Sequence, residues 1–230
     1  MDLDTLYLAL HTVVGEELEY KYYEGPRIRV LSVCYDLRHA LMGDSDVEFV
    51  GNGLDRDKMK RMALVAQEQN LYYKTRVIWP EILFVTAALN DFIRLYAKKQ
   101  AKNAPLPLLD RRAFWDPSVA TVRLFQAEIV KTLKDSVAEA SFSRMVNLMN
   151  KDYPWMAGYA TQYVDMLNIR HLELDADERQ KSLPTIAKRL MERGKEYQKM
   201  LQDITTMAHK HNCSVENIEL SLDYPTQIDW

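Results

Sequence analysis

Two segments of this chain are strongly apolar and yet carry charged residues near their centres, and this combination constrains the fold more than any other feature. The segments are residues 26–42 and 80–98. Each has the composition of a helix that is buried on most sides, and a buried charge is unfavourable unless a partner compensates it. Six polar residues lie in the two centres: Asp36, Arg38, His39, Asn90, Asp91 and Arg94. They predict either a structural polar network or a functional site.

The composition favours long helices with few breaks. The 230 residues include only 7 glycines and 8 prolines, too few for the many turns of a β-sandwich or barrel. Pro26 and Pro80 each begin one of the two apolar helices, at a position where no amide donor is needed. Apolar stripes at helical spacing predict further helices over residues 118–133, 138–149, 157–170 and 183–211, with a break at 153–155.

Two short segments have the alternation, or the β-branched and aromatic content, of strands. They are residues 47–50 and 71–78, on either side of a charged helix predicted over 55–66. We expect the two strands to pair. The predicted fold class is therefore mainly α (α+β): a multi-helix, bundle-like domain with a small two-stranded antiparallel sheet. A further alternation at 218–222 predicts an edge strand.

The domain organisation follows from one basic, proline-containing segment. Residues 98–112 contain two prolines and five bases against one acid, and they are the only stretch that resembles an internal boundary. We expect residues 1–230 to form a single compact domain. Its predicted subdivision is a mixed α+β part, residues 1–103, and an all-helical part, residues 113–230.

The polar residues of the first apolar helix have more than one interpretation. Asp36 and His39 share a stripe, as the charged residues of a solvated helix face also do, whereas Arg38 lies on the apolar side. In the second helix, Asp91 and Arg94 have the spacing of an ordinary helical ion pair. The amide of Asn90 needs a polar partner in its apolar surroundings, and the charged group of the first helix is the natural one.

If the two helices cross, the six side chains converge on a site. The catalytic candidates are Asp36, His39 and Asp91. The binding candidates are Arg38, Asn90 and Arg94. Arginines would bind a phosphate, and carboxylates with a histidine would bind a divalent metal. The alternative function is accordingly a metal- or phosphate-dependent hydrolase with a polar site between helices 26–42 and 80–98. No spacing is diagnostic, so the sequence assigns no metal and no cofactor, and it leaves open whether the protein is an enzyme.

Two other groups contain metal-ligand residue types. Glu16 and Glu19 match the first half of the E-x-x-E and E-x-x-D pattern of helical nucleotide pyrophosphohydrolases, but the second half is missing, which favours a solvated acidic loop. His209, His211 and Cys213 have the spacing of a zinc corner, yet no second Cys or His pair follows. Histidines near a helix C-terminus also complement its dipole, and this reading is preferred.

The net charge and the hydropathy of the chain limit the classes of partner that it can bind. The net charge of −3 gives no overall attraction to nucleic acid, so no nucleic acid partner is expected. The longest apolar run, residues 82–89, is far shorter than the roughly 20 residues of a membrane span, so no membrane association is expected. The first residues lack the basic start of a signal peptide. We expect a cytoplasmic protein.

The longest predicted helix favours an interaction protein. From Leu183 to Ala208 its apolar residues keep a 4-3 heptad spacing, which suits either a homo-oligomer through helix 184–211 or a seam inside one bundle. Complete catalytic motifs are absent from the sequence. The preferred function is therefore a non-enzymatic interaction or regulatory protein.

Four segments carry a resemblance to a known family: RVLSVCYDLRHALMGD (29–44), VEFVGNG (47–53), WPEILFVTAALNDFIRLY (79–96) and ATVRLFQAEI (120–129). Over roughly residues 26–130, the chain resembles an uncharacterised family of bacterial proteins of unknown function. The resemblance implies a bacterial or mobile-element origin and a mixed helix-and-strand fold. It transfers no catalytic residues.

Overall fold

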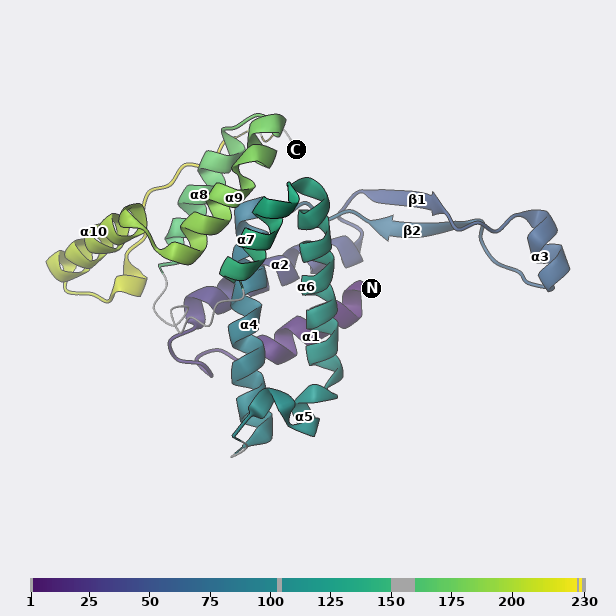
Figure 1. Cartoon of the computed structure of the whole chain (residues 1–230), viewed down its shortest axis with the longest axis horizontal. Coiled ribbons are helices and arrows are strands. Elements are labelled where there is room, and N and C mark those ends of the chain that lie inside the picture. The colour runs from purple at the N-terminus through teal and green to yellow at the C-terminus, as the bar shows by residue number, and fades with distance from the viewer. Residues whose placement is uncertain (1, 103–104, 150–159, 227, 229–230) are drawn as a thin grey trace.

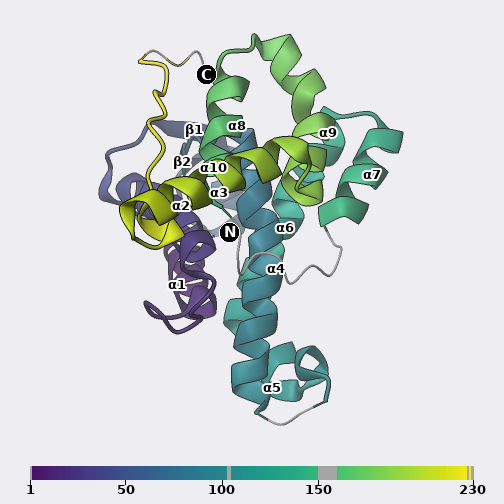
Figure 2. The same cartoon turned by 90° about the vertical axis from the view of Figure 1, so that its left-hand side faces the viewer.

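The long helix α4 (Trp79–Ala101) lies at the centre of the molecule, and the other helices surround it (Figures 1 and 2). The computed structural model describes residues 2–102, 105–149, 160–226 and 228. Helix α4 packs against elements from both halves of the chain, which are α1 (Leu3–Val14), α2 (Glu24–Met42), η1 (Pro107–Leu109), α5 (Arg111–Phe114), α6 (Pro117–Ser136), α8 (Gln162–Leu172) and α9 (Ala176–Glu192). The chain thus folds around its most apolar segment.

The sequence of α4 explains its central position. Its apolar residues point to every side, and the side chains of Leu83, Phe84 and Phe92 are completely buried. A helix that is apolar all round gains most when every face is covered. Although α4 is so apolar, none of the helices in the described residues is long and apolar enough to cross a membrane.

The two strands pair as predicted, and they form an arm that leaves the helical body. Strands β1 (Val47–Gly51) and β2 (Gln69–Tyr73) are antiparallel, with Val47 opposite Tyr73 and Phe49 opposite Leu71. Helix α3 (Arg56–Met62) connects their far ends and is shorter than predicted, because Ala63 adopts a left-handed conformation and ends it. Figure 1 shows this β-arm, residues 47–73, projecting away from the helices.

The described residues of the second half are mainly helical up to His211, as predicted. Helices α6 and α7 (Glu139–Met149) follow the predicted ranges, and α8 covers the end of the segment predicted as helix 157–170. The predicted break at 153–155 lies outside the described residues. Mainly helical content with one small antiparallel sheet is the predicted fold class, and it is confirmed.

The prediction of a single long helix over residues 183–211 is wrong. The structure has two helices there, α9 and α10 (Lys195–His211), because Arg193 is left-handed (φ 48°) and Gly194 is extended. Most of the heptad side chains, including Leu190 and Tyr197, are buried within the chain, whereas Leu201 is only partly buried. The heptad spacing thus fits a packing seam inside the chain, and oligomerisation through helix 184–211 stays a prediction.

The prediction of an edge strand over residues 218–222 is also wrong. Its backbone is held by a side chain instead of a neighbouring strand: the Gln162 amide donates to the carbonyl of Ile218 and accepts from the amide N–H of Leu220 at 2.6 Å. One glutamine thus satisfies two backbone groups that a β-ladder would otherwise pair. The segment lies against α8 without becoming a strand.

Candidate functional site

The charged group of α2 lies largely at the surface. Arg38, expected on the apolar side of its helix, is exposed, and that expectation is wrong. Asp36 and His39 are half-buried, and partial burial raises the pKa of the Asp36 carboxyl although His39 opposes this. His39 Nδ1 lies 3.1 Å from the carboxylate of Asp44 just beyond the helix end. The contacts of His39 are therefore local to its own helix.

The polar group of α4 is bound to α6 and not to α2. Asn90 Oδ1 accepts from Arg123 Nη1 at 2.5 Å and from Gln126 Nε2 at 3.1 Å. Its Nδ2 donates to the carbonyl of Met149, at the end of α7. The expectation that Asn90 pairs with the charged group of α2 is wrong, although a polar partner for this amide was correctly predicted. Beside it, the buried carboxylate of Asp91 pairs with Arg94.

Four of the six predicted residues thus have partners outside the proposed constellation or close to them in the sequence: Asn90 bonds to α6 and α7, Asp91 pairs with Arg94, and His39 lies against Asp44. On α2, Arg38 is exposed, and Asp36 and His39 are half-buried. Within the described residues, no three His, Cys, Asp or Glu side chains are grouped as a metal site, and this includes His209, His211 and Cys213.

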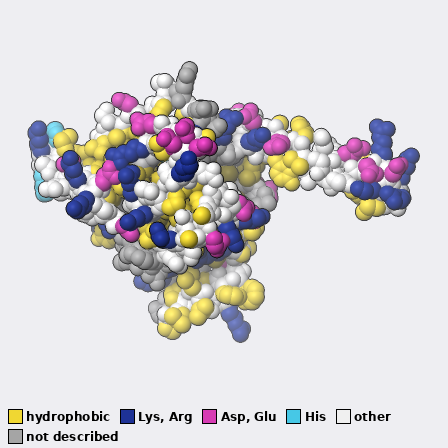
Figure 3. All heavy atoms as spheres, turned by 45° about the horizontal axis from the view of Figure 1, so that its top comes forward, with side chains coloured by type: hydrophobic (Ala, Val, Ile, Leu, Met, Phe, Trp, Pro, Cys, Tyr) yellow, Lys and Arg dark blue, Asp and Glu magenta, His cyan; other side chains and the backbone are white. Residues whose placement is uncertain are grey.

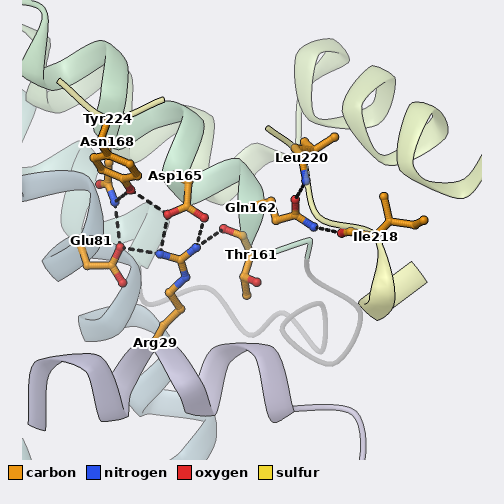
Figure 4. A network of polar contacts seen from close by, with 9 residues as sticks. All are labelled: Arg29, Glu81, Thr161, Gln162, Asp165, Asn168, Ile218, Leu220 and Tyr224. Atoms are coloured by element: carbon orange, nitrogen blue, oxygen red, sulfur yellow. Dashed lines mark hydrogen bonds and ion pairs between the residues drawn. The ribbon is translucent and has the colours of Figure 1, made fainter. Parts of the chain in front are cut away.

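A partly buried ionic network lies near the N-terminal ends of the two apolar helices (Figure 4). Arg29 of α2 forms ion pairs with Glu81 of α4, at 3.1 Å, and with Asp165 of α8. Asn168 Nδ2 donates to Glu81 at 2.9 Å, and the hydroxyl of Tyr224 donates to Asp165 at 2.7 Å. The network joins three helices to the C-terminal segment.

Electrostatics indicate that this network is a structural connection. Burial raises the pKa of the Glu81 carboxyl, even though Arg29 and the amide of Asn168 favour its ionised form. Glu81 Oε1 and Asn168 Oδ1 are buried and have no hydrogen-bond partner among the described residues. The guanidinium of Arg29 thus binds both carboxylates, and both of its terminal nitrogens donate hydrogen bonds within the network.

The β-arm has the opposite character, since it exposes apolar side chains on a projecting element. None of its residues, 47–73, is buried. Register and alternation put Val47, Phe49, Leu71 and Tyr73 on one face of the ribbon. All four are exposed, and Phe49 is 57% exposed. The arm therefore presents a continuous apolar face that nothing in the described chain covers.

A hollow of about 460 Å³ lies where the arm joins the body. We call it the root hollow. Its lining comes from the segment that enters α4, from the end of α6, and from α8 and α9: Val77, Ile78, Trp79, Asp135, Ser136, His171, Leu172, Ala176, Arg179, Gln180 and Leu183. His171 is 4% exposed, and its Nδ1 has no partner among the described residues. Burial, together with the charge of Arg179, lowers the pKa of His171 to about 4, so its imidazole is neutral near pH 7.

The projecting arm and the root hollow are not apparent from the sequence, for different reasons. The two strands were found, but their burial depends on whether another element covers them, and no local pattern reports that. The hollow is assembled from three stretches that are distant in sequence, residues 77–79, 135–136 and 171–183. One signal was present: the tip of the arm has apolar residues, Met62, Leu64 and Val65, beside a basic helix and far from any predicted partner.

Together, the fold and the site define a mainly helical domain with a projecting apolar β-arm. The chain belongs to the family described as Domain of unknown function (DUF6904), whose model matches residues 1–230. The resemblance to an uncharacterised family is thereby confirmed. No curated protein and no solved structure matches the chain.

Proposed function

We propose that this protein is a non-enzymatic interaction protein and that the β-arm is its binding element. The observation that carries the proposal is the exposed apolar face formed by Val47, Phe49, Leu71 and Tyr73. Exposed apolar patches on a soluble domain mark surfaces that bind another macromolecule. A ribbon of two short strands is marginally stable by itself, so a partner that covers this face would also stabilise the arm.

The open edges of the arm support the same function. Each strand is paired on one side only, and its other side presents free backbone groups. Such edges bind further strands unless charged residues block them. Glu48 and Lys74 form an ion pair at 3.1 Å near the base of the arm, which makes uncontrolled edge pairing less favourable there. The apolar face, rather than the edge, is then the preferred contact.

The hydrolase alternative receives less support. It requires Asp36, His39 and Asp91 to act together, and Asp91 is already paired with Arg94 while His39 lies against Asp44. The arginines that would bind a phosphate are likewise divided, because Arg38 is exposed on α2. We retain the interaction function. We also infer a cytoplasmic location and a bacterial or mobile-element origin, the latter from the family resemblance alone.

Photo-crosslinking in cells that produce the protein tests this function. A benzoyl-phenylalanine replaces Phe49 on the arm in one variant and Leu124, an exposed residue of α6, in a control. We expect irradiation to yield a discrete crosslinked protein band from position 49 and not from position 124. Crosslinking that is absent from position 49, or equal at both positions, would overturn the proposal.

A further inference from the structure

The tip and the root of the β-arm differ in charge. The tip, residues 55–65, has four bases against two acids, and the bases Arg56, Lys58, Lys60 and Arg61 are all exposed. Figure 3 shows Lys and Arg side chains together with apolar ones at the far end of the arm. Beside the root hollow, the turn between α8 and α9, residues 173–178, has four exposed acids and no base.

The two ends also differ in shape. The tip presents Met62, Leu64 and Val65, and Val65 is 100% exposed. The root has a hollow with a mixed lining: Val77, Ile78, Trp79, Leu172, Ala176 and Leu183 are apolar, and Asp135, Ser136, His171, Arg179 and Gln180 are polar. Methionine adapts well to irregular apolar surfaces. The apolar side chains of the tip thus complement the apolar part of the hollow, and its bases complement the acidic residues beside it.

The tip of one chain does not contact its own root, because the extended arm separates them (Figure 1). Two copies related by a two-fold axis remove this separation. When the two arms lie antiparallel and overlap along their full length, each tip reaches the root of the other copy. Both tip–root contacts then form at once, and the assembly is closed.

The size of the contact requires the body as well as the arms. Each strand has five residues, about 17 Å. Contact between two such ribbons alone falls short of the roughly 800 Å² per partner that stable interfaces bury. Seating both tips against the opposite bodies adds two further contacts. A stable interface of this kind therefore requires the seated tips in addition to the paired arms.

This inference rests on the proposed function and names the partner. We propose that the partner is a second copy of this chain, bound through an exchange of β-arms. The apolar faces that contain Phe49 pack against each other, and each tip enters the root hollow of the other copy. The bases of the tip then lie near the acidic turn of residues 173–178, where their opposite charges favour this pairing.

Analytical ultracentrifugation of the purified full chain tests the association. We expect a dimer in the micromolar range, and Phe49→Asp and Val65→Asp each weaken it at least tenfold, since they bury a charge at the contact. Phe114→Asp is the matched control, because Phe114 is exposed on α5 and outside the arm. It leaves the dimer intact. Circular dichroism verifies that all three variants are folded.

Charge reversal tests the geometry. One variant combines Lys58→Glu with Arg61→Glu, and the other combines Glu173→Lys with Asp177→Lys, which spares the capping box of Asp175 and Glu178. Each variant alone should lose the dimer: the reversed tip has an excess of acids and meets the acidic turn, whereas the reversed turn has two bases and two acids and no longer attracts the basic tip. Mixed together they should form a heterodimer, since the acidic tip then meets the two new lysines and the basic tip meets the unchanged acidic turn.

The outcomes separate this inference from the function on which it rests. A chain that stays monomeric at about 100 μM overturns the arm exchange. So does a dimer that survives Phe49→Asp and Val65→Asp, or reversed variants that do not combine on mixing. Crosslinking from position 49 to a different protein overturns the arm exchange but leaves the interaction function in place.

Discussion

The guanidinium of Arg29 on α2 donates to both carboxylate oxygens of Asp165 on α8, which is 136 residues further along the chain. The same guanidinium also donates to Glu81 at the start of α4. A planar fork that engages two acids fixes the relative orientation of the three helices more strictly than apolar packing can. This relationship connects the first and last thirds of the protein.

Replacing Arg29 by methionine should destabilise the fold strongly. The change leaves Glu81 and Asp165 largely buried beside each other without a cation. Breaking a buried ion pair in this way lowers the free energy of unfolding by about 3 kcal/mol or more. Urea unfolding followed by circular dichroism measures the loss. Arg29→Lys is the control, since it keeps the charge and gives up only the fork. A loss below about 1 kcal/mol for Arg29→Met would show that solvent compensates the two carboxylates.

Tyr224→Phe should release the C-terminal segment locally. The substitution removes the hydroxyl that donates to Asp165 at 2.7 Å and accepts from Asn168 at 3.2 Å. Because Tyr224 is partly solvent-exposed, we expect global stability to change by less than about 1 kcal/mol. The amide of Leu220, which donates to Gln162, should exchange with solvent faster. Tyr35→Phe, on the exposed face of α2, should leave that exchange rate unchanged, and an unchanged rate in Tyr224→Phe as well would contradict the connection.

The predictions that succeeded are those carried by local sequence. The apolar composition of residues 26–42 and 80–98 gave α2 and α4 to within three residues at each end. Alternation and β-branched content gave the pairing of β1 with β2. These properties depend on neighbours in the sequence, so a single sequence is sufficient to predict them.

The predictions that failed concern partners that are distant in sequence. Periodicity shows that Asn90 needs a polar neighbour, but it cannot distinguish α2 from Arg123 on α6. The apolar periodicity likewise continues through the break at Arg193, because α9 and α10 both bury their apolar stripes in the same core. The pairing of Arg29 with Asp165 has no local signature at all.

Replacing Asn90 by leucine should weaken the packing of α6 on α4. The change removes the acceptor for Arg123, which is exposed, and for Gln126, which is buried. A buried donor left without its acceptor costs about 1–3 kcal/mol. Chemical denaturation measures the loss. Asn90→Asp keeps an acceptor toward Arg123 and should lose less; equal losses in the two variants would contradict a role for these hydrogen bonds.

His171 should make the stability of the protein depend on pH below neutrality. Its pKa is about 4 in the fold because burial and Arg179 disfavour the cation, against about 6.5 in the unfolded chain. As pH falls from about 6.5 toward 4, the unfolded state therefore binds the proton first, and the contribution of His171 to stability is progressively lost. Above that window, the contribution is complete.

His171→Leu removes the titration, so the free energy of unfolding of this variant should fall less than that of the parent between neutral pH and pH 4.5. Carboxyl groups titrate in both proteins, so the difference between the two isolates the histidine. His209→Leu, at an exposed position, controls for the loss of an imidazole. Parallel pH profiles for the parent and His171→Leu would mean that water or a rearranged side chain stabilises the protonated ring.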